Sequence, residues 1–448
     1  MQGPAEPAGD AVPTTTSLRP LALGELHSSL SDPALTSMTL LNEIAGRFPA
    51  AVSFAAGRPY EGFHEPESLQ RHIGVFRDHL EADLGQSPEQ IRRTLFQYGR
   101  TKGTITHLVA RHLEVDEGLC VDPESVVVTT GCQEAMVLVL RALRRDERDV
   151  VLAPAPTYVG FIGAARLVDM PVRPVLEGPE GLDPEDLSRQ IRAARAEGLR
   201  PRACYVVPDF ANPGGASMPP QRRRQVLRIA EEEDILLLED NPYSMFQTSG
   251  VRPPTLKSMD EQRRVVYLGS FAKSAFAGAR VGYAVADQPV AEGSGAGLLA
   301  DELAKLKSML TLNTSTVAQA VIGGFLLENG CSVERAVTRE AMVYRENLRA
   351  VLSGLEARFP GSSADERGGV EWNAPGGGMF VVLTVPFRAD EEALEESAER
   401  FGVLWTPMHH FYAGAGGFRQ MRLSFSVLTP AAVNEGLDRL AAFIAHRS

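Results

Sequence analysis

The sequence predicts an α/β protein with a large domain built on a mostly parallel sheet and a smaller α+β domain at the carboxyl end. Three observations support this prediction. At 448 residues, the chain is longer than one small hydrophobic core normally organises. Between residues 125 and 270, short apolar runs alternate with stretches of helical period. After about residue 313, long helical stretches and strand-like segments replace that alternation.

The apolar runs of the central region predict buried strands. They are SVVVTT, DVVLAPAP, ACYVVPDF, DILLLED and RVVYLGS, in that order. Each run is continuous, whereas a strand with one solvated face would alternate apolar and polar residues. Segments such as GCQEAMVLVLRALRR and 161–167 have helical period and separate the runs. Successive strand and helix units of this kind indicate a sheet covered by helices on both faces.

The N-terminal part of the chain is expected to differ from this central region. Residues 1–18 are polar and rich in proline, so we expect a disordered tail there. An arm over residues 19–60 follows, in which LTSMTLLNEI (35–44) has helical spacing. The large domain is then expected over 61–312, beginning with a helix after Pro66.

The remaining residues, 313–448, are expected to form the small domain. The segments TVAQAVIGGFLLEN and AMVYRENLRAVLSGLEARF predict long helices. The segments GGMFVVLTV, GVLWTP and QMRLSFSV are strand-like, and AAVNEGLDRLAAFIAH closes the chain as a helix. The Gly-rich stretch 291–297, which lies before this domain, is expected to be a surface loop.

Composition excludes several classes of partner. The formal net charge of −12 does not favour nucleic acid or an anionic membrane. The four cysteines form no C-x-x-C pair, so neither a disulfide framework nor a metal site is expected. The N-terminus lacks the basic and apolar pattern of a signal peptide, and no apolar run is long enough to span a bilayer. A cytoplasmic protein is the simplest interpretation.

Candidate functional residues follow the predicted strands, because ligands bind at the carboxyl ends of parallel strands. They are Gly131-Cys132-Gln133, Pro156-Thr157-Tyr158, Asn212-Pro213, Asp240 with Tyr243, and Ser270-x-x-Lys273. Together they provide the groups needed to hold a phosphorylated pyridine aldehyde.

The segment SFAKSAFAGARVGY resembles the lysine motif of fold-type I, class I/II aminotransferases, which use pyridoxal 5'-phosphate (PLP). The resemblance extends in motif order from about Leu35 to the end of the chain. It implies a seven-stranded sheet in the large domain and PLP as the cofactor. It also implies transfer of an amino group between an amino acid and a 2-oxo acid.

The resemblance gives Lys273 the role of the lysine that binds PLP covalently and later moves the substrate α-proton. Burial beside other cations lowers the pKa of an amine and makes it nucleophilic. Asp240 matches the carboxylate that pairs with the pyridine nitrogen, which makes the ring an electron sink. Tyr158 matches the aromatic residue that stacks on the ring. Lys273, Asp240 and Tyr158 are therefore the expected catalytic residues.

The phosphate of PLP is expected between two parts of the large domain. Ser270 and Arg280 match phosphate ligands, and arginine offers a fixed fork of donors that suits phosphate oxygens. Gly131, Cys132 and Gln133 match the strand-to-helix turn under the same phosphate, where backbone N–H groups favour an anion. The family usually has Ser or Ala at position 132, so the thiol is expected to fill space rather than react.

Further residues match positions around the ring and the substrate. Tyr243 and Asn212 match donors to the phenolic oxygen of the ring. Arg422 matches the arginine that grips the substrate α-carboxylate, and Gly57 and Asn212 are expected at the same end of the substrate. Tyr98 resembles the tyrosine that reaches the phosphate of a neighbouring subunit, which implies a homodimer with shared active sites.

The segments SDPALTSMTLLNEI, FQYGRTKGTI and TTGCQEAM resemble the actinobacterial arylglycine transaminases, which make 3,5-dihydroxyphenylglycine or 4-hydroxyphenylglycine for peptide antibiotics. The chain resembles the 2-aminoadipate and kynurenine transaminase group more distantly. These likenesses predict a role in secondary metabolism. Elimination, replacement or ring formation on an amino acid remains an alternative, because the same residues serve those reactions.

Two adjacent histidines depart from the family pattern. Where the family often has P-G-x-x-F, this chain has Pro407, Met408, His409, His410 and Phe411. Either the histidines are exposed loop residues, or one of them contacts a polar group of the substrate.

Overall fold

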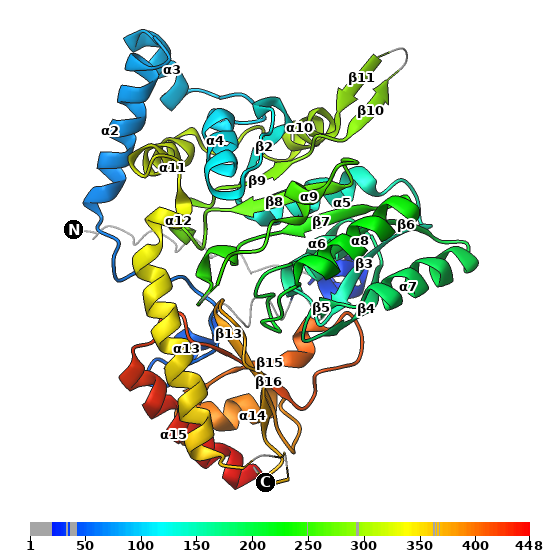
Figure 1. The fold of residues 1–448 in the computed structure, drawn as a ribbon, viewed down its shortest axis with the longest axis vertical. Helices are drawn as coiled ribbons and strands as arrows, with labels where there is room; N and C mark the ends of the chain where they lie inside the picture. Colours follow the sequence, from blue (N-terminus) through cyan, green and yellow to red (C-terminus); the bar gives the residue numbers. More distant parts are fainter. Residues whose placement is uncertain are drawn as a thin grey trace, which may run out of the picture.

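The structure is a computed structural model that describes residues 20–32, 35, 43–248, 250–292, 295–361, 363, 365–366 and 368–448. The tail expected over 1–18 and most of the helix expected over 35–44 lie outside the described residues. Figure 1 shows the large domain in the upper part of the molecule and the C-terminal elements below it.

The large domain is built on an eight-stranded sheet with the order β2-β9-β8-β7-β6-β3-β4-β5. The neighbours β4, β3, β6, β7 and β8 run parallel, and β9 is antiparallel to both β2 and β8. The mostly parallel sheet is thereby confirmed. The two-residue edge strand β5 pairs antiparallel with β4 and adds to the seven strands expected. The strands are β2 (Val126–Thr129), β3 (Asp149–Ala155), β4 (Val172–Gly178), β5 (Gly181–Leu182), β6 (Arg200–Val206), β7 (Leu236–Asp240), β8 (Val265–Ser270) and β9 (Gly282–Val285).

The central strands are buried on both faces, which explains their continuous apolar runs. In β3, Val151 and Ala153 join one hydrophobic core with residues of α5 (Gly131–Leu143) and α6 (Val159–Leu167). Leu152 between them joins a second core with α7 (Pro184–Ala196) and α8 (Pro220–Glu232). Helices therefore cover both faces of the sheet, as the alternation of runs and helical stretches predicts.

Further helices lie between residues 67 and 328, and α11, the last of them, falls within the range predicted for the small domain. They are α2 (Glu67–Ala82), α3 (Pro88–Phe96), α4 (Thr106–Glu117), α9 (Leu256–Met259), α10 (Leu299–Leu310) and α11 (Thr316–Glu328). Helix α11 packs against α2, where Glu328 pairs with Arg71 at 2.8 Å. The domain limits at 61, 312 and 313 stay predictions.

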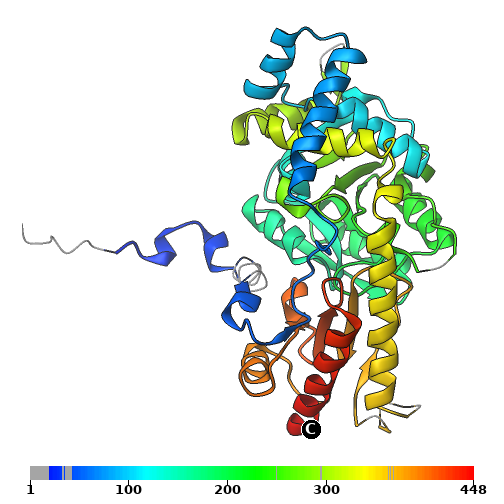
Figure 2. The same cartoon turned by 90° about the vertical axis from the view of Figure 1, so that its left-hand side faces the viewer.

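The C-terminal elements form a four-stranded antiparallel sheet with helices. Its order is β12-β13-β16-β15, with β12 (Glu371–Trp372), β13 (Phe380–Thr384), β15 (Thr406–Pro407) and β16 (Gln420–Ser424). The helices are α12 (Val333–Ala336), α13 (Thr338–Arg358), α14 (Glu391–Glu396) and α15 (Pro430–Arg447). Helices α13 and α15 lie side by side in both views (Figures 1 and 2).

The N-terminal arm joins the small domain before it reaches the large one. Its strand β1 (Val52–Ser53) pairs parallel with β14 (Val403–Leu404). The short helices η1 (Leu23–Glu25) and η2 (Ser28–Ser31) precede it and project from the side of the molecule (Figure 2), where Asp32 pairs with Arg166 of α6 at 2.9 Å. Because β1 is fixed to the small domain, the backbone that follows it runs along the boundary between the two domains.

The prediction of a surface loop over 291–297 is wrong. Strands β10 (Pro289–Glu292) and β11 (Gly295–Leu298) pair antiparallel there and form a hairpin that projects from the large domain (Figure 1). The glycines do not prevent pairing, because cross-strand backbone hydrogen bonds need no side chain.

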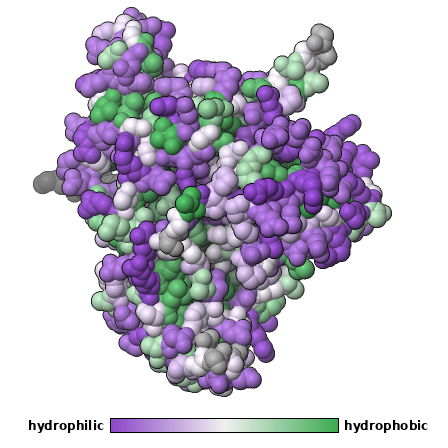
Figure 3. Space-filling view, viewed as in Figure 1, coloured by the Kyte–Doolittle hydropathy of each residue, from purple (hydrophilic) through white to green (hydrophobic). Residues whose placement is uncertain are grey.

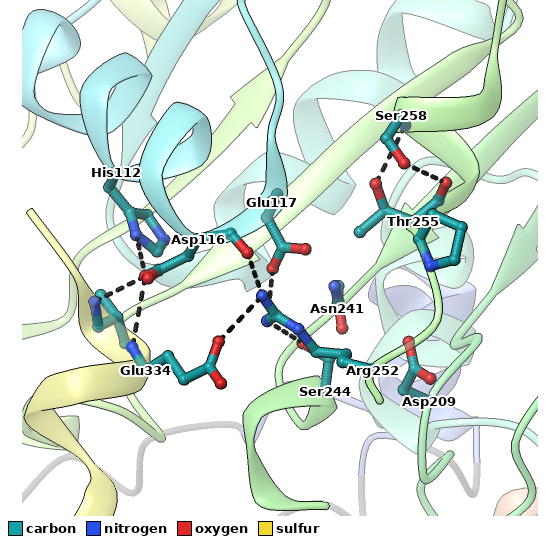
Figure 4. Close-up of polar contacts among 12 residues, drawn as sticks. His112, Asp116, Glu117, Asp209, Asn241, Ser244, Arg252, Thr255, Ser258 and Glu334 are labelled. Atoms are coloured by element: carbon teal, nitrogen blue, oxygen red, sulfur yellow. Dashed lines mark hydrogen bonds and ion pairs between the residues drawn. The ribbon is translucent and has the colours of Figure 1, made fainter. Parts of the chain in front are cut away.

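Buried charges tie α4 to α12 at the junction of the domains (Figure 4). Arg252 donates to Glu117 at 3.0 Å and lies 3.2 Å from Glu334. The Asp116 carboxylate lies 2.8 Å from Nδ1 of His112 and accepts backbone N–H groups from the start of α12. Each of these charges faces an opposite charge or a donor of this chain.

Hydrophilic side chains cover most of the face shown in Figure 3, in keeping with the net charge of −12. Among the described residues, no helix is both long and apolar enough to span a bilayer. The thiols of all four cysteines are free.

Candidate active site

Most of the expected site residues line one cavity of about 260 Å³. It lies where the carboxyl ends of β6, β7 and β8 meet the start of α5 and the N-terminal arm. The expected residues that line it are Gly57, Cys132, Gln133, Tyr158, Asn212, Asp240, Tyr243, Ser270, Lys273, Arg280 and Arg422. Segments far apart in the sequence therefore meet at the edge of the sheet that the strand pattern indicates.

The amine of Lys273 lies at the centre of these groups. Its Nζ donates to the backbone carbonyl of Gly57 at 2.6 Å. Burial, with smaller contributions from Arg422 and Arg280 and against the opposing effect of Asp240, lowers the pKa of Lys273 to about 8. About a tenth of the amine is therefore uncharged at pH 7, and the uncharged amine is the form that acts as a nucleophile or a base.

Asp240 ends β7 and receives two hydrogen bonds from side chains. Tyr205 donates its hydroxyl to Oδ2 at 2.7 Å, and the Cys132 thiol donates to Oδ1 at 3.6 Å. Burial raises the pKa of Asp240 to about 6, although these hydrogen bonds and Lys273 lower it. The sequence places Cys132 under the phosphate and does not predict a contact with Asp240. In the structure its thiol forms this contact with the carboxylate.

Tyr205 was missing from the residues that the sequence pattern singles out. It is fully buried in β6, and its ring stacks on Phe161 at 4.0 Å. Its position one residue before the end of a strand could have revealed it, because a hydroxyl in an otherwise apolar run needs a buried partner.

Arg422 projects from β16 of the small domain into the cavity. Its guanidinium donates to Oδ1 of Asn212 at 2.6 Å and to the carbonyl of Ala55 at 2.8 Å. The rings of Phe380 and Phe411 lie 4.4 and 4.9 Å from it. Burial lowers the pKa of Arg422 to about 10. Within the described part of the chain, no carboxylate forms an ion pair with this arginine.

A cradle of donors lies at the start of α5. Arg280 packs so closely over Gly131 that a Cβ at position 131 would lie 2.3 Å from its Nη2 atom. Ser270 and Gln133 line the cavity beside it, and Oε1 of Gln133 is buried without a hydrogen-bond partner. The arginine, the N–H groups at the helix start and the Ser270 hydroxyl provide donors for an anion.

Two tyrosines of the cavity keep their protons. Burial raises the pKa of Tyr158 and of Tyr243, so both phenols remain donors at physiological pH. Tyr243 is 4% exposed, and a hydrogen bond with Asn212 links it to the groups around Arg422.

Tyr98 lies outside the cavity of its own chain, and 81% of its surface is exposed. Phe96 beside it is 77% exposed. The structure therefore brings neither Tyr98 nor its neighbours to the site.

The interpretation of the histidines as exposed loop residues is wrong, and the contact of one of them with a substrate group stays a prediction. His409 and His410 are not among the residues that line the cavity, and their side chains are only 18% and 6% exposed. Both rings face Glu391, while the neighbouring Phe411 lines the cavity. Burial and the neighbouring His409 lower the pKa of His410 to about 4.

The cavity has an excess of positive charge. Among the described residues that line it, Arg58, Lys273, Arg280 and Arg422 are basic, and Asp240 is the one acid. The cavity thus combines a lysine of lowered pKa with basic groups at Arg280 and at Arg422. This combination, at the carboxyl edge of an α/β sheet, is typical of an enzyme whose substrates or cofactors are small anions.

Comparisons with known proteins show to which enzyme family the chain belongs. Residues 67–440 match the family described as aminotransferase class I and II. The chain is 54% identical over 95% of its length to (S)-3,5-dihydroxyphenylglycine transaminase of Amycolatopsis orientalis, of which it covers 95%. It is 31% identical over 88% of its length to 2-aminoadipate transaminase of Thermus thermophilus, of which it covers 89%.

A solved aminotransferase structure is also similar to this chain. The kynurenine aminotransferase of Pyrococcus horikoshii, solved in complex with PMP, has a TM-score of 0.77 and 26% identity. The match covers 93% of this chain and 95% of that one. The present chain belongs to the aminotransferase class I and II family, and it is an aminotransferase of the fold-type I architecture.

Proposed function

We propose that this aminotransferase acts on an arylglycine, such as 3,5-dihydroxyphenylglycine or 4-hydroxyphenylglycine, in actinobacterial secondary metabolism. The 54% identity to a dihydroxyphenylglycine transaminase over 95% of both chains is the observation that carries the proposal. Cavity walls formed by Met136, Tyr158, Val159 and Phe411 suit an aromatic ring attached directly to the α-carbon.

PLP is the cofactor of this family, and the cavity fits it. The cradle of Arg280, Ser270 and the start of α5 suits a dianionic phosphate, because each of these groups offers hydrogen-bond donors, and Gln133 lines the same space. When bound, PLP accepts the amino group and withdraws electrons from the α-carbon. We propose that Asp240 pairs with its ring nitrogen, that Asn212 and Tyr243 hold its phenolic oxygen, and that Tyr158 covers its ring.

Side chains of the cavity then have separate roles in the reaction. Lys273, with its pKa lowered to about 8, gives up its proton readily and can carry a proton to and from the substrate α-carbon. Arg422 holds the α-carboxylate by two parallel hydrogen bonds, which orients the α-carbon. Phe380 and Phe411 exclude water around this arginine and strengthen its attraction for the carboxylate.

A homodimer with shared active sites is part of the proposal. Phe96 and Tyr98 are exposed beside the start of α11, where Val317 is 51% exposed. Met309 and Leu310 of α10 are also exposed. Apolar side chains in such number on one domain are typical of a surface that another subunit covers. The cytoplasmic location stays a prediction.

Substrate preference tests the arylglycine assignment. Purified holoenzyme is assayed with (S)-3,5-dihydroxyphenylglycine, 4-hydroxyphenylglycine, 2-aminoadipate, kynurenine and aspartate, each with a 2-oxo acid acceptor. We expect kcat/KM for an arylglycine to exceed the others at least tenfold. A higher value for 2-aminoadipate or kynurenine would contradict the assignment, while leaving the aminotransferase activity itself intact.

The same assay distinguishes transamination from elimination or replacement. Transamination yields one aminated acceptor for each 2-oxo acid released, whereas elimination releases ammonia. The relatives and the solved neighbour described above are aminotransferases by name, which favours the first outcome.

Light scattering of the eluted enzyme tests the proposed dimer, for which twice the 48.5 kDa chain mass is expected.

A further inference from the structure

Glu391, His409 and His410 form a compact cluster on the small domain. Glu391 is the first residue of α14, and the histidines lie in the one-turn helix η7 (Met408–Phe411). Nε2 of His409 lies 3.1 Å from Oε1 of Glu391, and Nε2 of His410 lies 3.2 Å from the same oxygen. One ligand atom from each residue lies within 4.8 Å of the other two.

These separations suit a small cation between the three atoms. In a tetrahedral zinc site with bonds of about 2.0–2.1 Å, two ligand atoms are about 3.3 Å apart. The nitrogen-to-oxygen distances of 3.1 and 3.2 Å are close to this value, and the two imidazole nitrogens lie within 4.8 Å of each other. Imidazole nitrogens with a carboxylate oxygen are also the ligands that zinc and similar divalent ions prefer.

The charge of the cluster favours a cation as well. In the described part of the chain, Glu391 forms ion pairs with the two histidines but with no lysine or arginine. Arg388, the nearest basic residue in sequence, pairs with Asp390 at 2.7 Å. No described lysine or arginine therefore competes with a cation for the Glu391 carboxylate.

The surrounding structure fixes the ligands before any ion binds. The His409 ring stacks on Phe418 at 5.5 Å with an interplanar angle of 14°. The side chain of Asp390 caps α14 by accepting from the N–H of Ala393, which holds Glu391 at the helix start. Ligands that are held in place lose little conformational entropy on binding.

We propose that Glu391, His409 and His410 bind one Zn²⁺ ion, with water as the fourth ligand. The ion would connect α14 to η7, whose last residue, Phe411, lines the active-site cavity. The carbonyl of Phe411 also accepts from the N–H of Thr157 in the large domain at 2.8 Å. A bound ion would therefore brace one wall of the cavity from outside, without contacting the substrate.

Calorimetric titration tests this site directly. Untagged holoenzyme is treated with a chelator, freed from unbound PLP and titrated with Zn²⁺. We expect one ion per chain and an upward shift of the thermal midpoint, because a ligand that binds the native state stabilises it. Co²⁺ in place of Zn²⁺ should produce the visible absorption of a tetrahedral ion.

Three variants locate the bound ion. His409→Ala and Glu391→Gln should each weaken Zn²⁺ binding by at least about tenfold and abolish the thermal shift. Glu391 is 53% exposed, so its variant tests the site even if His409→Ala proves unstable. His79→Ala is the matched control, because His79 and His107 form another imidazole pair with Nε2 atoms 3.2 Å apart.

The proposal is overturned if the chelated holoenzyme binds no Zn²⁺. It is also overturned if His79→Ala weakens binding while His409→Ala and Glu391→Gln bind as the parent does. Either result would leave the aminotransferase assignment unaffected, because the cluster lies outside the cavity.

Discussion

Two arginines with little exposed surface, Arg252 and Arg422, behave in opposite ways. Arg252, at the junction of α4 and α12, donates to Glu117 and pairs with Glu334 (Figure 4). Although burial alone would lower the pKa of Arg252, these two carboxylates raise it above its usual range. Arg422 has only neutral partners in the described chain, and burial lowers its pKa to about 10.

The difference shows how a structural charge can be told from a functional one. A buried charge that the chain itself neutralises fixes the fold. A buried charge without a counterion costs stability, and such a group is typical of a site that a ligand completes. The cavity holds Arg58, Lys273, Arg280 and Arg422 against Asp240 alone, and we propose that the phosphate and the substrate carboxylate supply the missing negative charges.

The largest expected effect follows from removing the lysine. Lys273→Ala should lower kcat by about 10⁴-fold or more, because the cavity loses both its nucleophile and its proton carrier. The midpoint of guanidinium denaturation should remain close to that of the parent. A variant that retains more than a hundredth of the activity would show that another group moves the proton.

Removing the structural arginine should affect stability instead. Arg252→Met removes the cation beside Glu117, whose pKa burial already raises to about 7, so the carboxyl can protonate and we expect a loss of about 1–3 kcal/mol in the free energy of unfolding. At a temperature where the variant is folded, kcat/KM should change less than twofold. A large loss of activity with unchanged stability would remove the distinction between the two arginines.

The functional arginine should give the reverse result. Arg422→Lys keeps the charge but loses the paired donors, so kcat/KM should fall about 100-fold with little change in denaturation midpoint. Steady-state assays with a fixed acceptor measure this effect. If kcat/KM for amino acids stayed within threefold of the parent, another cation would have to hold the carboxylate.

The smallest effect concerns pH. Above pH 6 Asp240 is ionised and can pair with a protonated ring nitrogen, and above pH 8 Lys273 is uncharged and nucleophilic. The rate at which the enzyme without cofactor captures PLP should therefore rise with pH between about 6 and 8. Stopped-flow absorbance at a series of pH values measures this rate.

Tyr205→Phe sharpens the pH prediction. Its hydroxyl lowers the pKa of Asp240, so its loss should move the lower inflection upward by about one pH unit. The upper inflection, which belongs to Lys273, should stay in place. An unchanged lower inflection would mean that the inflection does not report on Asp240.

Much of the site could be predicted from the sequence because its residues follow strands. Continuous apolar runs mark the strands, and chain direction places the residues after each run at one edge of the sheet. Lys273, Asp240, Asn212 and Tyr158 follow this rule, and the structure places them around one cavity. The fold class followed from the same periodicity.

Other features depend on contacts between residues distant in sequence, which periodicity does not describe. Tyr205 faces Asp240 because β6 and β7 are neighbours, and the arm places the Ala55 carbonyl at Arg422 because β1 pairs with β14. His409 and His410 turn away from the cavity because η7 presents Phe411 to it and directs both rings to Glu391. The sequence by itself thus determined the strands and the chemistry at their ends. Only the tertiary structure decided which partner each buried polar group faces, because such partners come from packing between elements.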